Sequence, residues 1–293
     1  MANSRIKWID GGKGVAMLMV MAVHLSQKYS WLPGTLFSFG AMGVQLFFLL
    51  SGYCLCKNPR CNNKHYMKRE LINRYRRLAP WYLVGIAIYA VYYWFSENWM
   101  ALEKFTPLNI CANVLMVNSF FPVAQNTIVP GGWSISCIAL FSFCFPIFIL
   151  NEGRVRLCLL SVFSFIGTAI AVIGYNVLDW PRQYTYCSIM NQFVVFALGA
   201  IYCSKAKLFS YIRPIFAIGV ALVFFIIAVA TVLIDREYSI LYRHIIVSIS
   251  FISLFPLLER FETYLPSWLI WVGRHSYEIF ILHFLAIWLL PTF

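Results

Sequence analysis

Charged residues are scarce in this sequence, and acidic residues are the scarcest of them. Only 12% of the 293 residues are Asp, Glu, Lys or Arg, whereas a soluble domain has about 25%. Hydrophobic residues make up 61% of the chain. A composition so poor in charge excludes a water-soluble globular protein and predicts an integral membrane protein with many apolar segments.

Several other signals are absent. The sequence has no internal repeat, no low-complexity stretch and no small-residue cleavage site after its first apolar run that would predict a signal peptide. Most of the nine Cys lie inside apolar runs, which indicates buried thiols and not disulfides or a metal site. Cys56 and Cys61 are too loosely spaced for a zinc site. We therefore expect one domain over 1–293, without a metal or a nucleic-acid partner.

What the sequence does contain is a series of apolar runs separated by Pro, Gly and charged residues. A bilayer core of about 30 Å needs about 20 helical residues. The run at 109–122 is short and carries three Asn, so it is a candidate for a re-entrant or tilted segment, with nine crossings in place of ten. The fold class that we predict is an all-α transmembrane bundle of about ten helices, at 13–31, 36–56, 79–96, 109–122, 131–150, 157–178, 186–203, 213–234, 240–258 and 267–290.

Basic residues concentrate in the segment 57–77, which holds eight of the 23 Lys and Arg and a single acid, Glu70. The positive-inside rule places this segment and the amino terminus in the cytoplasm, favours nine crossings and predicts a multi-pass protein of the cytoplasmic (inner) membrane. Contact with anionic membrane lipids is one explanation of the charge. A phosphate site is another, because Arg74 and Arg77 are three residues apart and share a helix face.

His24 is the most informative single residue. It lies at the far end of an apolar run that opens on Lys13, 11 residues earlier, or about 16 Å along a helix axis. An ionisable residue is expensive in a membrane helix and usually lines a cavity where it has a partner or a substrate. Neutral imidazole is a suitable general base near pH 7. A core histidine bound to a backbone carbonyl is the alternative.

Four sequence blocks carry a resemblance to a known family. They are Trp8-Ile-Asp10-Gly-Gly-Lys13-Gly-Val-Ala16 running to His24; Gly43-Val-Gln-Leu-Phe-Phe-Leu-Leu-Ser51-Gly-Tyr53 followed by Arg74-x-x-Arg77-x-x-Pro80; Gly132-Trp133-Ser134-Ile-Ser136 running to Phe145-Pro146; and Gly273-Arg-His-Ser276-Tyr277-Glu-Ile-Phe-Ile-Leu-His283. In their order and spacing the chain resembles the acyltransferase-3 family of integral membrane acyltransferases.

The resemblance implies transfer of a short acyl group, most often acetyl, from cytosolic acyl-coenzyme A to a hydroxyl of a cell-surface or lipid-linked glycan. Acyl-coenzyme A would be a cosubstrate, and no cofactor would be bound permanently. His24 would be the catalytic residue, either as a base or as the carrier of the acyl group. The resemblance implies substrate or donor binding by Lys13, Arg74, Arg77, Asp10, Trp133, Ser134, Tyr277 and His283.

Structural roles are the alternatives for several of these residues. Asp10 would cap the first helix, where the helix dipole favours an acid. Trp133 would be an interfacial or pocket-lining aromatic, and Ser134 would bridge helices by a hydrogen bond. Tyr277 would pack the last helix, and it lies six residues from His283, too far around the helix to share a face with it closely.

The chain departs from the family pattern at two places. The usual Arg is Lys13 here, which keeps the charge but not the bidentate fork. The usual Glu of the third block is missing, because Ile138 and Ala139 stand there. Two other function classes remain open: a transporter or flippase for a lipid-linked sugar, which often has paired repeats, and a catalytically retired relative that acts as a binding or assembly subunit.

Overall fold

The computed structural model of the chain describes residues 6–29, 38–57, 64–96, 104–149, 153–235 and 237–291. In these ranges every regular element is a helix and none is a strand, which confirms the all-α prediction. The chain divides into two compact units, 1–54 with 198–293, and 55–197. The unit boundaries fall within α3 (Gly43–Lys57) and α11 (Ile189–Phe209). That the whole chain forms one domain stays a prediction.

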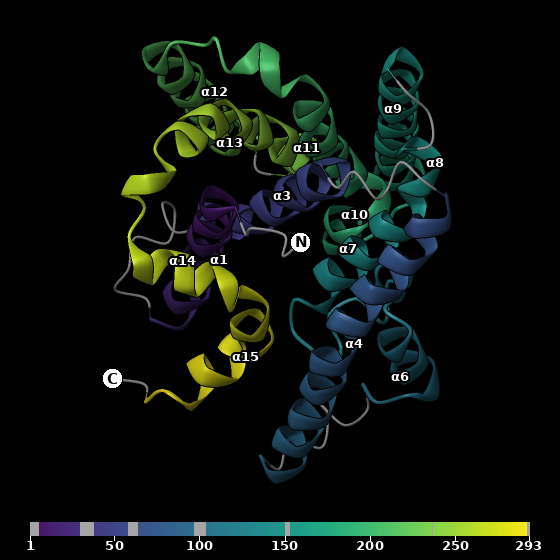
Figure 1. Ribbon diagram of the computed structural model, residues 1–293. Coiled ribbons are helices and arrows are strands. Elements are labelled where there is room, and N and C mark those ends of the chain that lie inside the picture. Colours follow the sequence, from purple (N-terminus) through teal and green to yellow (C-terminus); the bar gives the residue numbers. More distant parts are fainter. Residues whose placement is uncertain are drawn as a thin grey trace. The chain divides into compact units, whose positions relative to one another are not determined.

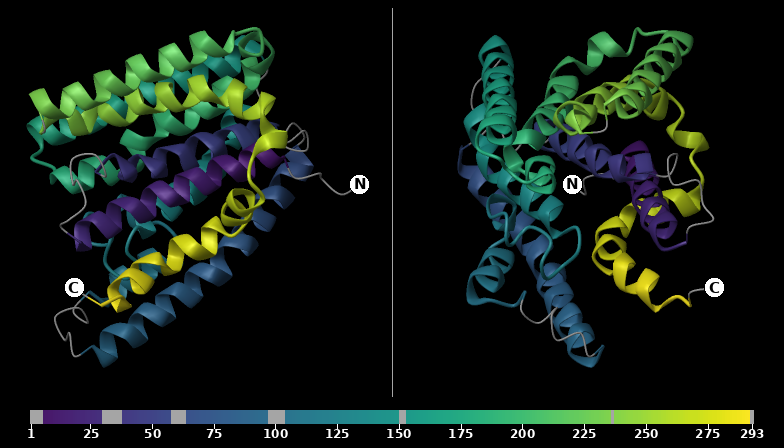
Figure 2. Two further views of the ribbon diagram at one scale, coloured as in Figure 1. Left: turned by 90° about the vertical axis from the view of Figure 1, so that its left-hand side faces the viewer. Right: turned by 180° about the vertical axis from the view of Figure 1, so that it is seen from behind.

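The first unit is built around α1 (Lys7–Lys28). This helix packs against α14 (Ser267–Arg274) and α15 (Ser276–Leu289). Two further helices, α12 (Pro214–Ile234) and α13 (Arg243–Arg260), lie side by side in the same unit (Figure 1). The views in Figure 2 show the same pairing of α12 with α13 and the course of α14 and α15 along α1.

The contact between α1 and α14 depends on glycine. A Cβ atom on Gly273 would overlap the backbone carbonyl of Asp10, and one on Gly14 would overlap the carbonyl of Leu269. The two backbones therefore approach more closely than any side chain would allow. Trp8, which is only 1% exposed, completes the core at this end of α1.

The second unit contains a buried polar network as well as apolar helices. Its elements are α4 (Lys64–Phe95), α6 (Pro107–Val114), η3 (Asn118–Phe120), α7 (Gly132–Cys144), α8 (Pro146–Ile149), α9 (Gly153–Val177), α10 (Arg182–Cys187) and the first part of α11. The Tyr82 hydroxyl donates to Asn113 Oδ1 (2.8 Å), and the Ser136 hydroxyl donates to the Met116 carbonyl (2.8 Å). Buried polar groups need such internal partners, particularly where no water reaches them.

Five helices in the described part of the chain are long and apolar enough to cross a membrane. Three of them have windows only 28%, 28% and 17% buried inside the protein, which suits helices whose side chains face lipid. The prediction of a multi-pass helical membrane protein agrees with these segments, and the number of crossings stays a prediction. The five are Phe39–Lys57, Leu71–Phe95, Gly153–Val177, Arg182–Phe209 and Pro214–Ile234.

The segment 57–77 lies outside the predicted helices, the next of which was expected to begin at 79, and this prediction is wrong in its greater part. Helix α4 begins at Lys64, so the residues from there to 77 are helical, and 58–63 lie outside the described residues. Lys, Arg, Leu and Glu are good helix formers, and they continue directly into the apolar part of α4. Pro80 lies within this helix, where it removes one backbone hydrogen bond without ending the element.

Two predicted helices are each divided in the structure. The run 267–290 is broken at His275, whose φ of −101° and ψ of 13° separate α14 from α15. The run 131–150 is broken at Phe145, immediately before Pro146 begins α8, and its end at 150 lies outside the described residues. Pro146 can begin a helix but cannot supply the N–H that would continue the previous one.

The short run at 109–122 does not form a long helix, as its length suggested. It covers most of the eight-residue helix α6, which begins earlier at Pro107, and the single turn η3. Eight residues extend only about 12 Å, much less than a bilayer core. The predicted ends at 31 and 36 of the first two helices lie outside the described residues.

Candidate active site

Helix α1 positions the first two candidate residues. It runs without a break through Lys13 and His24 and ends at Lys28. Eleven residues correspond to three turns plus about 20°, so Lys13 and His24 share one face of α1 and lie about 16 Å apart along its axis. Both side chains are half-buried.

The His24 imidazole has one engaged nitrogen and one open nitrogen. His24 Nδ1 lies 2.9 Å from Gln27 Oε1. A carbonyl oxygen can only accept, so Nδ1 carries the hydrogen and Nε2 keeps a lone pair. The described part of the chain offers no hydrogen bond to this Nε2. Gln27 therefore selects the tautomer in which Nε2 is the basic atom.

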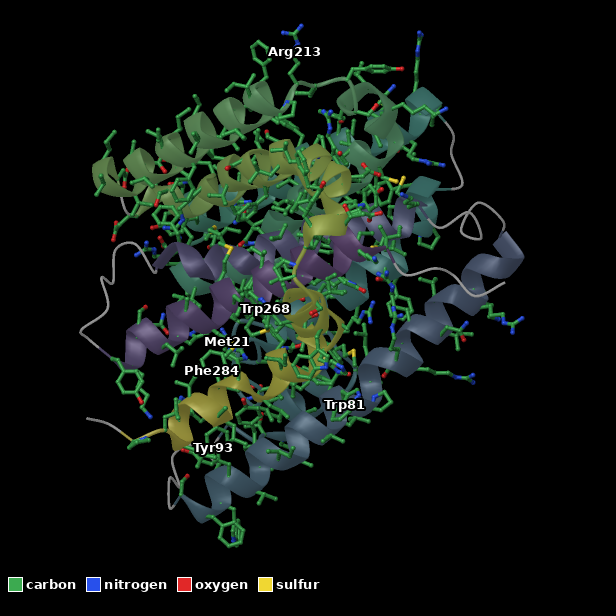
Figure 3. All side chains as sticks on the ribbon, turned by 60° about the vertical axis from the view of Figure 1, so that its left-hand side comes forward. Met21, Trp81, Tyr93, Arg213, Trp268 and Phe284 are labelled. Atoms are coloured by element: carbon green, nitrogen blue, oxygen red, sulfur yellow. The ribbon has the colours of Figure 1, made fainter. Side chains whose placement is uncertain are left out.

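Helix α15 places a second histidine beside the first. The ring centroids of His24 and His283 are 5.3 Å apart, with an angle of 37° between the ring planes. Phe284 packs against both rings, at 4.1 Å from His24 and 4.4 Å from His283, and it is labelled on α15 in Figure 3. Two residues that are far apart in sequence thus form one imidazole pair.

His283 is more deeply enclosed than His24. Its Nδ1 donates to the carbonyl of Phe280 at 2.6 Å, and the residue is only 3% exposed. Its Nε2 is buried and has no hydrogen-bond partner among the described residues. A buried acceptor without a donor raises the free energy of the folded protein. A ligand group that donates a hydrogen bond to this atom would remove that cost.

Lys28 holds the far end of α15 against α1. Its ammonium donates to the backbone carbonyls of Ile287 (2.7 Å), Trp288 (3.3 Å) and Leu290. These carbonyls belong to the last turn of α15 and the residue after it, where carbonyl groups lack the N–H donors that the next turn of a helix would supply. The positive charge also complements the carboxyl end of the helix dipole. Gln27 and Lys28 were not among the predicted site residues, although both follow His24 within about one turn.

Asp10 pairs with an arginine on α14. Arg274 Nε lies 3.3 Å from Asp10 Oδ2, and the two side chains are 43% and 11% exposed. The prediction that Asp10 caps the first helix is wrong, because α1 begins at Lys7 and its N-cap, Ile6, makes no side-chain cap bond. Asp10 lies inside the first turn, where it neutralises Arg274.

Tyr277 lies in the first turn of α15, next to the buried Ser276 and half-buried itself. Six residues correspond to about 600° of helix rotation, so Tyr277 and His283 point to different faces of α15. The structure therefore does not bring Tyr277 to the imidazole pair through their common helix.

Arg74 and Arg77 belong to the second unit. Arg74 Nη1 donates to the Ser142 hydroxyl (2.9 Å), and Ser142 in turn donates to the Ile138 carbonyl (2.7 Å). Arg77 is exposed. Arg74, Ser142 and Ala139 line one small hollow between α4 and α7. Ala139 is one of the two positions where the family usually has Glu. The observed partner of Arg74 is instead the hydroxyl of Ser142, about one helical turn further along α7.

Trp133 and Ser134 open helix α7. Gly131, just before it, has φ of 77°, a left-handed conformation that favours glycine. The Ser134 hydroxyl donates to the Gly131 carbonyl (2.9 Å), and Trp133 stacks edge-on with Tyr186 at 5.7 Å. Both residues are buried. Their observed contacts hold the start of α7 in place.

The structure thus divides the candidate residues into separate groups. His24 and His283 form a pair, and Asp10 pairs with Arg274 in the same unit. Arg74, Arg77, Trp133 and Ser134 all lie in the other unit. Among the described residues no three His, Cys, Asp or Glu side chains are grouped so that they could hold a metal ion.

Comparison with known proteins places the chain in a class. A family model described as an acyltransferase domain matches residues 6–293, nearly the whole chain. The chain therefore belongs to this acyltransferase family, as the four sequence blocks predicted. The match to the family model covers residues of both compact units.

The chain is also similar to part of one individual, curated protein. The chain is similar to the peptidoglycan O-acetyltransferase OatA of Listeria monocytogenes serovar 1/2a, with 36% identity over 88 residues. The match covers 29% of this chain and 13% of the relative, so it spans a small part of both proteins. No solved structure matches the chain.

Proposed function

We propose that this protein is a membrane O-acyltransferase that moves a short acyl group, acetyl in the first place, from acyl-coenzyme A to a hydroxyl of a cell-surface or lipid-linked glycan. Membership of the acyltransferase family supports the reaction class. The local similarity to a peptidoglycan O-acetyltransferase supports acetyl as the group and a glycan as the acceptor.

The orientation of His24 is the observation that carries the proposal. Its Nδ1–H is bound to Gln27, which leaves Nε2 as the base. In the proposed reaction His24 Nε2 takes the proton of the acceptor hydroxyl, and the hydroxyl oxygen attacks the thioester carbonyl carbon. The C–S bond then breaks, and the thiolate of coenzyme A receives the proton from His24. General base catalysis of this kind contributes about 10²- to 10⁴-fold to the rate.

Basic residues supply the proposed donor site. Arg74 and Arg77 would bind phosphate groups of coenzyme A, because guanidinium groups form strong charge-assisted bonds to phosphate oxygens. Separately, in the first unit, Lys13 would supply a positive charge on the His24 face of α1. The positive-inside rule supports a cytoplasmic position for the basic part of α4 and for the amino terminus, and hence a cytosolic donor and an inner-membrane location.

Labelled acetyl-coenzyme A tests the proposal. Membranes that contain the wild-type protein should transfer label to glycan, and membranes with His24→Ala should not. His275→Gln is a matched control, because His275 is an exposed histidine that stacks on Trp271 and lies outside the imidazole pair. It should retain transfer.

The other outcomes identify the alternatives. Movement of a lipid-linked sugar without any acyl donor would identify a flippase and contradict the proposal. Absence of labelled glycan in both the wild type and His24→Ala would identify a retired binding subunit. That second result would agree with the missing Glu at Ile138 and Ala139.

A further inference from the structure

The imidazole pair offers two lone pairs to one ligand. In each ring the Nδ1 hydrogen is already engaged, by Gln27 Oε1 for His24 and by the Phe280 carbonyl for His283. Both rings are therefore held in the tautomer whose Nε2 only accepts hydrogen bonds. The ring centroids are 5.3 Å apart, so the two acceptors belong to one small region of the protein.

A ligand of this pair must bring hydrogen-bond donors. A metal ion is a poor candidate, because the described residues supply no third ligand. Two protonated rings would repel each other at this separation, so at least one ring stays a neutral acceptor during the reaction. The buried Nε2 of His283 accordingly needs an O–H or N–H group, and the chain's described residues provide none.

Sugars carry hydroxyl groups on adjacent carbon atoms. We propose that the pair recognises two neighbouring hydroxyls of the acceptor: His24 Nε2 takes the proton of the reacting hydroxyl, and His283 Nε2 accepts a hydrogen bond from the hydroxyl beside it. This inference rests on the proposed function and adds to it a requirement for a second free hydroxyl. His283 thereby determines acceptor specificity.

The two rings are suited to different parts of this task. His283 is anchored by a backbone carbonyl of its own helix and is almost completely buried, so its lone pair has a fixed direction. His24 is half-buried and is oriented by a side chain, Gln27, so it can receive and release a proton at an accessible place. Phe284 packs on both rings.

Deoxy sugars test the inference directly. The full chain in lipid nanodiscs is given labelled acetyl-coenzyme A and either methyl α-D-glucopyranoside or one of its four monodeoxy derivatives. For the wild type we expect that removal of one hydroxyl next to the acylated one lowers kcat/KM by roughly tenfold to a hundredfold, because a buried acceptor is left unpaired. Mass spectrometry identifies the acylated position.

Two substitutions of His283 show whether this residue reads the neighbouring hydroxyl. His283→Asn keeps an N–H at the position of Nδ1 but has no acceptor at Nε2. We expect it to lower kcat/KM for the intact glucoside by the same factor. For the deoxy glucoside, kcat/KM should be the same in His283→Asn as in the wild type. His283→Gln, whose amide oxygen reaches the place of Nε2, should restore part of the difference. The melting temperature of each variant shows whether it is folded.

Each remaining outcome is decisive. An equal deoxy penalty in the wild type and in His283→Asn overturns the inference and leaves the proposed function intact. Where native polysaccharide is the acceptor that is labelled, transfer that His283→Asn leaves unchanged has the same meaning. If no sugar or polysaccharide is labelled in a His24-dependent manner, the proposed function fails and the inference fails with it.

Discussion

The two ends of helix α1 are held in different ways. At the amino-terminal end, Gly14 and Gly273 let the backbones of α1 and α14 approach closely, and an ion pair, Asp10 with Arg274, joins their side chains. At the carboxyl-terminal end, polar side chains from α1 reach α15. The difference indicates that one end is specified by shape and the other by hydrogen bonds, and the candidate chemistry lies at the second.

Gly273→Ala should disrupt the contact between the amino-terminal end of α1 and α14, and we expect it to have the largest effect on stability. The new methyl group would overlap the Asp10 carbonyl, so α1 and α14 must separate. We expect a loss of about 3 kcal/mol or more in the free energy of unfolding. Thermal unfolding of the purified protein in detergent measures it. Gly219→Ala is the matched control, because a Cβ there meets no atom within 4 Å. Equal stability of the two variants would contradict the prediction.

Lys28→Met should weaken the hydrogen-bonded end by a smaller amount. The substitution keeps an unbranched chain but leaves the carbonyls of Ile287, Trp288 and Leu290 without the ammonium. Hydrogen bonds to charged groups contribute about 1.5–3 kcal/mol, and we expect a loss in this range. Hydrogen exchange of the last turn of α15 should increase more than exchange in α12. Unchanged protection of α15 would show that Lys28 does not hold it.

Gln27→Met should leave stability unchanged and lower kcat for acetyl transfer by roughly tenfold, because His24 then loses the acceptor that selects its tautomer. Gln27→Glu is the matched variant, since a carboxylate also accepts from Nδ1–H, and it should retain most of the activity. If both variants behave alike, Gln27 has no part in orienting His24.

Asp10→Asn should have the smallest effect. The ion pair with Arg274 is 43% exposed on the arginine side, and such pairs contribute less than about 1 kcal/mol. We expect a shift of that size in unfolding free energy and no change in the Michaelis constant for the donor. A large rise in this constant with unchanged stability would instead make Asp10 a donor-binding residue.

The sequence was sufficient for features that repeat along one helix. Lys13 and His24 share a face of α1 because 11 residues nearly complete three turns, and this periodicity can be read directly. The all-α class followed from the apolar runs in the same way. The family also followed, because its motifs are local blocks of residues that keep their order.

Features that depend on distant residues could not be predicted in this way. His24 meets His283, and Lys28 meets Ile287, 259 residues further along the chain, and no local pattern connects them. The break at His275 has no Pro at that position to reveal it. The start of α4 was predicted too late, at 79, because only the apolar run was counted as helix, although the basic residues before it also favour a helix. Ser142 became a partner of Arg74 only through the packing of α7 on α4.

The tether from Lys28 to α15 also has a consequence for biosynthesis. Ribosomes make α1 well before α15, so the ammonium of Lys28 has no carbonyl partners until the chain between the two helices has been made. The imidazole pair likewise cannot exist until residue 283 has been made. Nascent chains that lack α15 therefore lack this pair altogether.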